Sequence, residues 1–157
     1  MKQSRRTFLQ ASMTACTVAV AASAGLLTPR AVLAAAWPKS AFMAKSVNDA
    51  LKALSGTSST ANSKDITIQA PDIAENGAVV SITVKTSLPK TSQISILVPH
   101  NTTPLCASYL FTEDTEPYIT GRIKMRKSSD VIAVAKAGGK LLSTKKSVKV
   151  TLGGCGG

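Results

Sequence analysis

The sequence of 157 residues contains one histidine and few aromatic residues. With His100 as its single imidazole, the chain cannot form a site that needs two histidines, and most zinc geometries are unfavourable. Aromatic residues make up 4% of the chain, which argues against stacking platforms for single-stranded nucleic acid in spite of the formal net charge of +11. We therefore expect neither a metal ion nor nucleic acid as a partner.

Strongly apolar runs are also missing, and the first 36 residues instead have the features of an export signal. Residues 4–10 (SRRTFLQ) match the twin-arginine pattern, and Ala34 and Ala36 precede a plausible cleavage site before Trp37. A retained membrane anchor is the alternative, but the alanine-rich stretch between them is interrupted by polar residues and falls short of the ~20 apolar residues of a membrane span. We expect cleavage of residues 1–36, export of the folded chain to the periplasm and no membrane association afterwards.

Processing changes both the charge and the number of cysteines. The signal carries four of the 19 basic residues and none of the 8 acidic residues, so the mature chain keeps a net charge of +7. Cys16 leaves with the signal, while Cys106 and Cys155 remain. They remain in a compartment where disulfides persist.

The mature chain starts with a helical period and continues with a period of two. Apolar residues first recur at helical spacing: Met43, Val47, Ala50, Leu51 and Leu54. Ser40 is a suitable N-cap and Gly56 a suitable stop, so we expect one N-terminal helix, detached from the strands that follow. Residues 55–64 form a polar link without periodicity.

About seven short segments then alternate apolar and polar residues, with Pro, Gly and Asn between them. The positions that share a face are Ile66 and Ile68; Val80, Ile82 and Val84; Ile94, Ile96 and Val98; Leu105, Ala107, Tyr109 and Phe111; Ile119, Gly121, Ile123 and Met125; and members of 131–137 and 140–152. Gly138-Gly139 is a two-residue hairpin signal. The pattern predicts a mainly β fold over residues 37–152, an immunoglobulin-like antiparallel β-sandwich.

The sequence ends in a thiol between two glycine pairs, Gly153-Gly154 and Gly156-Gly157. Glycine loses the most conformational freedom on ordering, so this segment resists joining the preceding strand. Five extended residues span up to about 17 Å, and the small flanks let the peptide enter a narrow cleft. Residues 153–157 are therefore predicted to form a flexible arm that presents Cys155 to other proteins.

Cys155 has no His, Lys or Arg within five residues along the chain. An exposed thiol of this kind has a pKa near ~8.5 and is only a few per cent thiolate at about pH 7. Cys155 is therefore interpreted as a handle for covalent attachment and not as a catalyst. An incidental cysteine on a free end is the alternative, although a free thiol is a liability in an oxidising compartment.

These residues resemble the SoxY family, the sulfur-carrier subunits of the bacterial thiosulfate-oxidising Sox system. The terminal Gly-Gly-Cys-Gly-Gly matches that family's C-terminal motif. Residues 71–77 (PDIAENG) are similar to its proline–acidic–Glu-Asn-Gly loop, residues 122–125 (RIKM) to its basic strand motif, and residues 148–152 (VKVTL) to the strand that leads into its arm. Leu152 stands where the family often has another aliphatic residue.

The resemblance implies a carrier without turnover chemistry of its own and without a cofactor other than a sulfur intermediate on Cys155. It implies a heterodimer with SoxZ, which is exported alongside. It also implies transient docking with three enzymes. The haem enzyme SoxAX joins thiosulfate to the cysteine, the hydrolase SoxB releases the terminal sulfone as sulfate, and SoxCD, where present, oxidises the remaining sulfane sulfur. The alternative from another class is a structural or adhesion-type immunoglobulin-like module that is tethered through its tail cysteine.

Other residues have simpler structural interpretations. Cys106 is more simply a packed thiol than a functional one, and its pairing with Cys155 or with a partner thiol stays open. His100 is most simply a loop residue, because a ligand or base would need partners that are missing. Asp72 and Glu75 precede an Asn-Gly pair and indicate a turn rather than a pair of catalytic carboxylates.

The mature chain also contains two groups of basic residues. One group alternates with apolar residues, which predicts a charged strand face: Arg122, Lys124, Arg126 and Lys127. A solvated face is the default interpretation. Together with Lys145, Lys146 and Lys149, however, these residues could steer anionic substrates or acidic partners.

Overall fold

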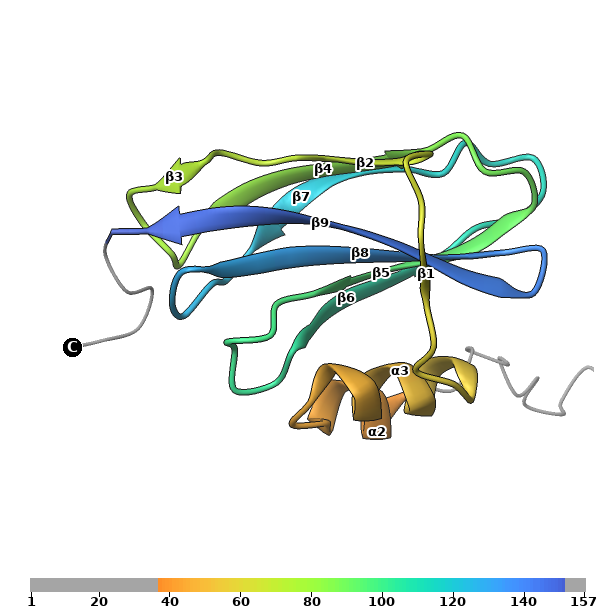
Figure 1. Ribbon diagram of the computed structural model, residues 1–157, viewed down its shortest axis with the longest axis horizontal. Helices are drawn as coiled ribbons and strands as arrows, with labels where there is room; N and C mark the ends of the chain where they lie inside the picture. Colours follow the sequence, from red (N-terminus) through yellow and green to blue (C-terminus); the bar gives the residue numbers. More distant parts are fainter. Residues whose placement is uncertain (1–36, 152–157) are drawn as a thin grey trace, which may run out of the picture. The chain divides into compact units, whose positions relative to one another are not determined.

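Two short helices and nine strands make up residues 37–151, the part of the chain that the computed structural model describes (Figure 1). The predicted signal over residues 1–36 and the predicted arm over residues 153–157 lie outside the described residues. No helix within the described part is long and apolar enough to cross a membrane.

The N-terminal helical segment consists of two helices, α2 (Lys39–Met43) and α3 (Val47–Ser55), and not of the single helix that was predicted. The break occurs because Ala44 is extended, with ψ 145°, and because Ser46 starts a new helix. The Ser46 side chain accepts a hydrogen bond of 3.1 Å from the backbone N–H three residues later, which is the usual action of an N-cap. The N-cap of α3 is therefore Ser46 and not Ser40. A single helix had been expected because apolar residues recur at helical spacing on both sides of the break.

Three glycines take the left-handed conformation that their predicted roles require. Gly56 ends α3 with φ 78°, and its N–H donates to Lys52 O at 2.8 Å. Gly138 and Gly139 have φ 54° and 80°. They form the predicted hairpin turn, because positive φ at both positions matches the twist of the flanking strands.

The seven predicted strand segments are all present, and two strands of two residues each were missed. In chain order the strands are β1 (Ala61–Asn62), β2 (Ile66–Gln69), β3 (Ile73–Ala74), β4 (Val80–Thr86), β5 (Thr91–Leu97), β6 (Leu105–Leu110), β7 (Tyr118–Ile123), β8 (Ser129–Ala137) and β9 (Lys140–Val150). The missed strands β1 and β3 have no alternating pattern of their own. Both pair in parallel with β9, which supplies the hydrogen-bonding edge.

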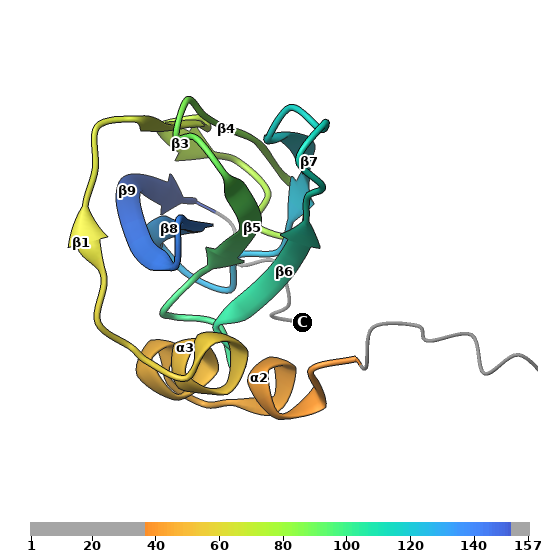
Figure 2. The same ribbon diagram turned by 90° about the vertical axis from the view of Figure 1, so that its right-hand side faces the viewer.

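The strands form two sheets that face each other (Figure 2). The larger has the order β1-β9-β8-β5-β6, with β3 also paired to β9, and the smaller has the order β2-β4-β7. The predicted β-sandwich is thus confirmed. It is antiparallel except where β1 and β3 meet β9, and its likeness to immunoglobulin domains stays a prediction.

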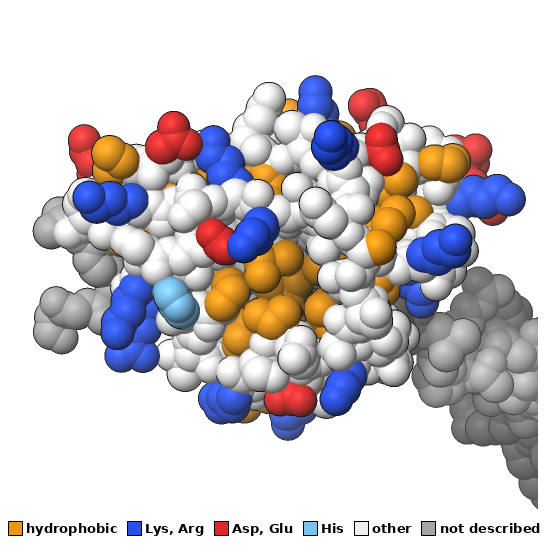
Figure 3. Space-filling model, viewed as in Figure 1, with side chains coloured by type: hydrophobic (Ala, Val, Ile, Leu, Met, Phe, Trp, Pro, Cys, Tyr) orange, Lys and Arg blue, Asp and Glu red, His pale blue; other side chains and the backbone are white. Residues whose placement is uncertain are grey.

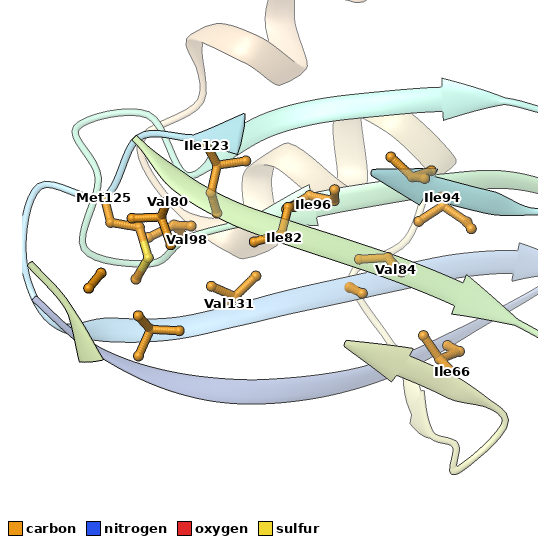
Figure 4. Close-up of a cluster of buried hydrophobic side chains, with 14 of the residues drawn as sticks. Ile66, Val80, Ile82, Val84, Ile94, Ile96, Val98, Ile123, Met125 and Val131 are labelled. Carbon is orange, nitrogen blue, oxygen red and sulfur yellow. The ribbon is translucent and has the colours of Figure 1, made fainter. Parts of the chain in front are cut away.

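Aliphatic side chains between the two sheets form the main core (Figure 4). Its fully buried members include Val80, Val84, Ile94, Ile96, Val98, Met125, Val131 and Val148. Burial of one such side chain stabilises the fold by about 1.5–3 kcal/mol, so this cluster supplies a large share of the stability. It also gives the loops at both ends of the sandwich a rigid support.

A second cluster joins the helices to the outer face of the larger sheet, so the expectation of a detached helix is wrong. Its buried members are Ala41, Ala50, Leu51, Leu97, Leu105, Val134 and Leu141. Figures 1 and 2 show α2 and α3 on the side of this sheet that faces away from β2, β4 and β7. Strand β5 is therefore buried on both faces, with Ile96 inward and Leu97 beneath the helices.

Candidate functional site

The predicted attachment residue Cys155 and its flanking glycines lie outside the described residues, which include the strand that leads to them. We use "arm root" for residues 149–151, the last two residues of β9 and the residue that follows them. Strand β3 and the loop before it hold the root on one side. Lys149 N donates to Asp72 O at 2.9 Å, and Thr151 N donates to Ala74 O at 3.1 Å. The chain is thus fixed by backbone hydrogen bonds to a point four residues before Cys155.

The loop that follows β3 is a turn, as predicted. Asn76 Oδ1 accepts a hydrogen bond of 2.8 Å from the backbone N–H two residues later, which is the geometry of an Asx-turn. Asp72 and Glu75 have separate contacts, the first through its side chain and the second through its backbone. Asp72 forms an ion pair of 3.1 Å with Lys146, while the backbone carbonyl of Glu75 accepts from Thr151 Oγ1 at 3.5 Å. The segment therefore holds the arm root, and its carboxylates are not paired.

Ser128 and His100 hold the arm root from the opposite side. Ser128 Oγ accepts a hydrogen bond of 2.9 Å from Val150 N. The carbonyl of Ser128 lies 2.7 Å from His100 Nδ1. Because a carbonyl can only accept, Nδ1 carries the proton. His100 lies in a turn after β5, as predicted, but its contact with a residue 28 positions away has no signal in the sequence.

The basic residues are arranged differently from the predicted strand face. Strand β7 ends at Ile123, so Lys124, Arg126 and Lys127 lie in the loop beyond it. Asn101 shapes this loop. Its Oδ1 accepts from Arg126 N at 2.9 Å, and its Nδ2 donates to Lys124 O at 2.7 Å.

Two of the lysines that were expected to add to this positive charge have acidic partners. Lys145 pairs with Asp130 and Lys146 with Asp72, both at 3.1 Å. Their field is therefore partly cancelled, and the steering role stays a prediction. Among the described residues of this set, Arg126, Lys127 and Lys149 form no ion pair.

An open hollow of about 440 Å³ lies beside the arm root. His100, Arg126, Lys127, Ser128 and Val150 line it. Figure 3 shows the pale blue histidine beside Lys and Arg side chains. Two chain segments that are far apart in the sequence thus bring basic groups to Val150, the last paired residue of β9.

Cys106 lies in a separate groove of about 580 Å³ between β6 and β7, which are edge strands of the two sheets. Burial raises the pKa of the Cys106 thiol to about 11, and a hydrogen bond from Asn101 opposes this rise. Asn101 Nδ2 lies 3.5 Å from the sulfur. Cys106 is a free, partly buried thiol within the described residues, which agrees with its interpretation as a packed residue. Its pairing with Cys155 stays a prediction.

The described part of the chain holds no group of three or more His, Cys, Asp or Glu side chains that could bind a metal ion. His100 and Asp72 are at the same end of the sandwich, but their polar contacts are with Ser128 and Lys146. Within residues 37–151 the site has groups that can bind and orient a ligand and hold the arm root in place. The predicted attachment residue Cys155 lies outside these residues.

The comparison with protein families decides which kind of protein this is. The family described as sulfur oxidation protein SoxY matches residues 51–155. The chain belongs to the SoxY family. The matched range is more than half of the chain and reaches Cys155, the predicted attachment residue.

A solved structure agrees with the SoxY assignment. The sulfur carrier protein SoxY from Chlorobium limicola f thiosulfatophilum is 40% identical, with a TM-score of 0.63. The match covers 73% of this chain and 99% of that chain. The comparison with curated proteins finds no match. The SoxY fold is thus a β-sandwich here as well, and a sulfur-carrier role follows from the family.

Proposed function

We propose that the mature chain is a periplasmic carrier that holds the sulfur intermediates of thiosulfate oxidation covalently on Cys155. The observation that carries this proposal is the SoxY family match, which extends through the glycine-flanked thiol at the C-terminus. A solved relative at 40% identity is a sulfur carrier. The attachment residue, the glycine arm and the absence of turnover chemistry belong to the proposal.

The proposed loading step joins two sulfur atoms. The Cys155 thiol and the outer sulfur of thiosulfate form an S–S bond, one proton leaves, and a haem enzyme, SoxAX, takes up two electrons. A hydrolase, SoxB, then adds water across the terminal bond, so that sulfate leaves and a persulfide stays on Cys155. Where SoxCD is present, it oxidises the remaining sulfane sulfur. The carrier supplies the thiol, the reach of the arm and the fixed root, and no cofactor.

The proposed location of this chemistry rests on the first 36 residues. We infer that the twin-arginine signal exports the folded chain and is then removed before Trp37. Support comes from the match to the signal pattern and from Ala34 and Ala36 at the cleavage site. The measurement is the N-terminal mass of the protein from a periplasmic extract. A chain that retains residues 1–36 in the membrane fraction would contradict export in this form.

We infer that the partner is SoxZ and that the free sheet edges take part in the contact. Strands β6 and β7 are the outer strands at one side of the two sheets, and unpaired edges are usually covered. Three large side chains on these strands are exposed, Leu110 by 68%, Tyr118 by 52% and Tyr109 by 40%. A monodisperse, fully soluble monomer after expression without a partner would count against the heterodimer.

The decisive experiment is mass spectrometry of the mature protein after incubation with thiosulfate and the haem enzyme. A gain of mass on the C-terminal peptide that is absent from the Cys155→Ser variant would support the carrier. Cys106→Ser should load like the wild type. A permanent disulfide from Cys155 to one fixed protein would instead support a tethered structural module. Sulfur attachment to Cys106 alone would reject the proposed attachment site.

A further inference from the structure

The hollow beside the arm root has basic walls from separate parts of the fold. His100 comes from the turn after β5, Arg126 and Lys127 come from the loop after β7, and Val150 comes from the end of β9. The three basic residues also line an adjoining hollow of about 400 Å³. None of the residues that line either hollow is acidic. The chain thus concentrates positive charge where β9 ends.

The Arg126 side chain is held in place, and within the described residues no carboxylate pairs with Arg126 or Lys127. Arg126 is fixed by two hydrogen bonds, from its backbone N to Asn101 Oδ1 at 2.9 Å and from Nη1 to Thr102 Oγ1 at 3.1 Å. Within residues 37–151, neither Arg126 nor Lys127 forms an ion pair. The nearby Asp130 lines a neighbouring hollow with His100, but its carboxylate is already paired with Lys145.

We propose that this hollow binds a sulfur oxyanion, the terminal sulfonate of the intermediate that is attached to Cys155. The proposal rests on the proposed function. Val150 lines the hollow, and the five residues from there to Cys155 span up to about 17 Å when extended. The guanidinium of Arg126 can donate two parallel hydrogen bonds to such an anion. The attached anion is thus within reach of the basic walls.

Because the anion is attached to the chain, it can occupy the hollow even if the hollow has a low affinity for the free anion. A short flexible link gives the tethered group an effective concentration on the order of millimolar, so a site of millimolar affinity for the free anion is filled about half of the time. The uncharged thiol lacks this attraction. Binding therefore distinguishes the loaded from the empty carrier, and the loaded arm rests at its root between visits to the enzymes.

The test uses the full mature chain and loads it without any enzyme. The Cys155 thiolate attacks tetrathionate and forms an S–S bond, so that Cys155 carries –S–SO3⁻ and thiosulfate leaves. NMR then follows the backbone amides of residues 126–128 and the His100 ring. Free thiosulfate is titrated into the Cys155→Ser variant at constant ionic strength, with chloride as the comparison anion. This second arm separates the free anion from the tethered one.

A matched pair of double variants tests the site. R126A/K127A removes two charges from the hollow, while K85A/K140A removes two exposed charges from the opposite end of the sandwich. We expect loading and millimolar thiosulfate to shift the signals of the hollow in the wild type and in K85A/K140A. In R126A/K127A the thiosulfate affinity should fall at least about tenfold, a difference of 1.4 kcal/mol. Thermal unfolding of both variants shows whether the fold is retained.

Three results would overturn the proposal. Equal losses of affinity in the two double variants would mean that only net charge matters. Chloride shifts as large as those of thiosulfate would mean that the hollow does not select the oxyanion. Binding of free thiosulfate without any response to loading would reject the tethered ligand. If enzymes fail to load Cys155, the proposed function fails, while the titration with free thiosulfate still decides on the hollow.

Discussion

The two ends of β9 are built in different ways, although a glycine pair lies beyond each of them. At its start, Gly138-Gly139 closes a hairpin with the neighbouring strand mainly by its positive φ angles, with one long hydrogen bond of 3.4 Å from Gly138 N to Lys90 O. At its end, the strand is held by the carbonyls of β3 and its preceding loop and by Ser128. The first end is therefore specified locally, whereas the position of the arm root depends on residues that lie far away in the sequence.

This difference suits a carrier. A turn that depends mainly on local backbone conformation needs few contacts with distant residues. The proposed arm has to start from a defined point and in a defined direction, because five extended residues span only about 17 Å. The end that leads to Cys155 accordingly donates backbone hydrogen bonds to two separate parts of the chain and is lined by basic groups. The other end carries exposed lysines such as Lys140.

The largest expected effect concerns the Cys106 thiol, in the groove between β6 and β7. With a pKa raised to about 11, Cys106 is almost entirely protonated at pH 8. In the Cys155→Ser variant, iodoacetamide should label it on the order of 100-fold more slowly than a cysteine in an unstructured peptide. The rate should rise about tenfold per pH unit up to pH 11. Labelling as fast as the peptide would show that the groove between β6 and β7 is open.

Removal of Asn101 should weaken the arm end without touching the hairpin end. Asn101→Ala deletes hydrogen bonds to Lys124 O and Arg126 N, each worth about 0.5–1.5 kcal/mol, so the free energy of unfolding should fall by about 2 kcal/mol. Urea unfolding measures it. Thr102→Ala, which loses one exposed bond to Arg126, is the matched control and should change stability by less than about 0.5 kcal/mol. Equal effects of both variants would contradict this account.

Valine in the C-terminal glycine pair should affect loading and not stability, whereas valine in the hairpin pair should affect stability and not loading. Gly154→Val keeps the Cys155 thiol but adds bulk to the proposed arm, so enzymatic loading should slow roughly tenfold or more while stability stays unchanged. Small alkylating reagents should still label the thiol at the wild-type rate. Normal enzymatic turnover by this variant would show that slenderness is unimportant.

At the hairpin, Gly139→Val should reduce stability and leave loading intact. Gly139 has φ 80°, and no atom lies within 4 Å of the position that a Cβ would take there, so the cost is conformational, about 1–2 kcal/mol. Gly121→Ala is the control, because its Cβ would meet only Tyr109 Oη at 3.9 Å in a strand without positive φ. A loss of stability in the control as large as in Gly139→Val would point to packing instead of backbone conformation.

The sequence predicted the parts of the molecule whose signals are local. Alternation located the seven longer strands, and the Gly138-Gly139 pair located the hairpin. The attachment role that the terminal motif suggested for Cys155 stays a prediction. The break in the helical segment was missed because apolar spacing continues across it while the cap of Ser46 interrupts the backbone. The basic hollow was missed because His100, Arg126 and Val150 meet only through the pairing of distant strands, which no spacing rule describes.

The smallest expected effect tests the root itself. Ser128→Ala removes the oxygen that accepts from Val150 N at 2.9 Å, at a cost of about 1 kcal/mol. The Val150 amide should therefore exchange its hydrogen about fivefold faster, while amides near Lys140 keep their wild-type rates. Ser147→Ala, at an exposed position of β9, is the matched control. Faster exchange along the whole strand would mean that Ser128 supports the sheet generally, and the two ends of β9 would then not be independent.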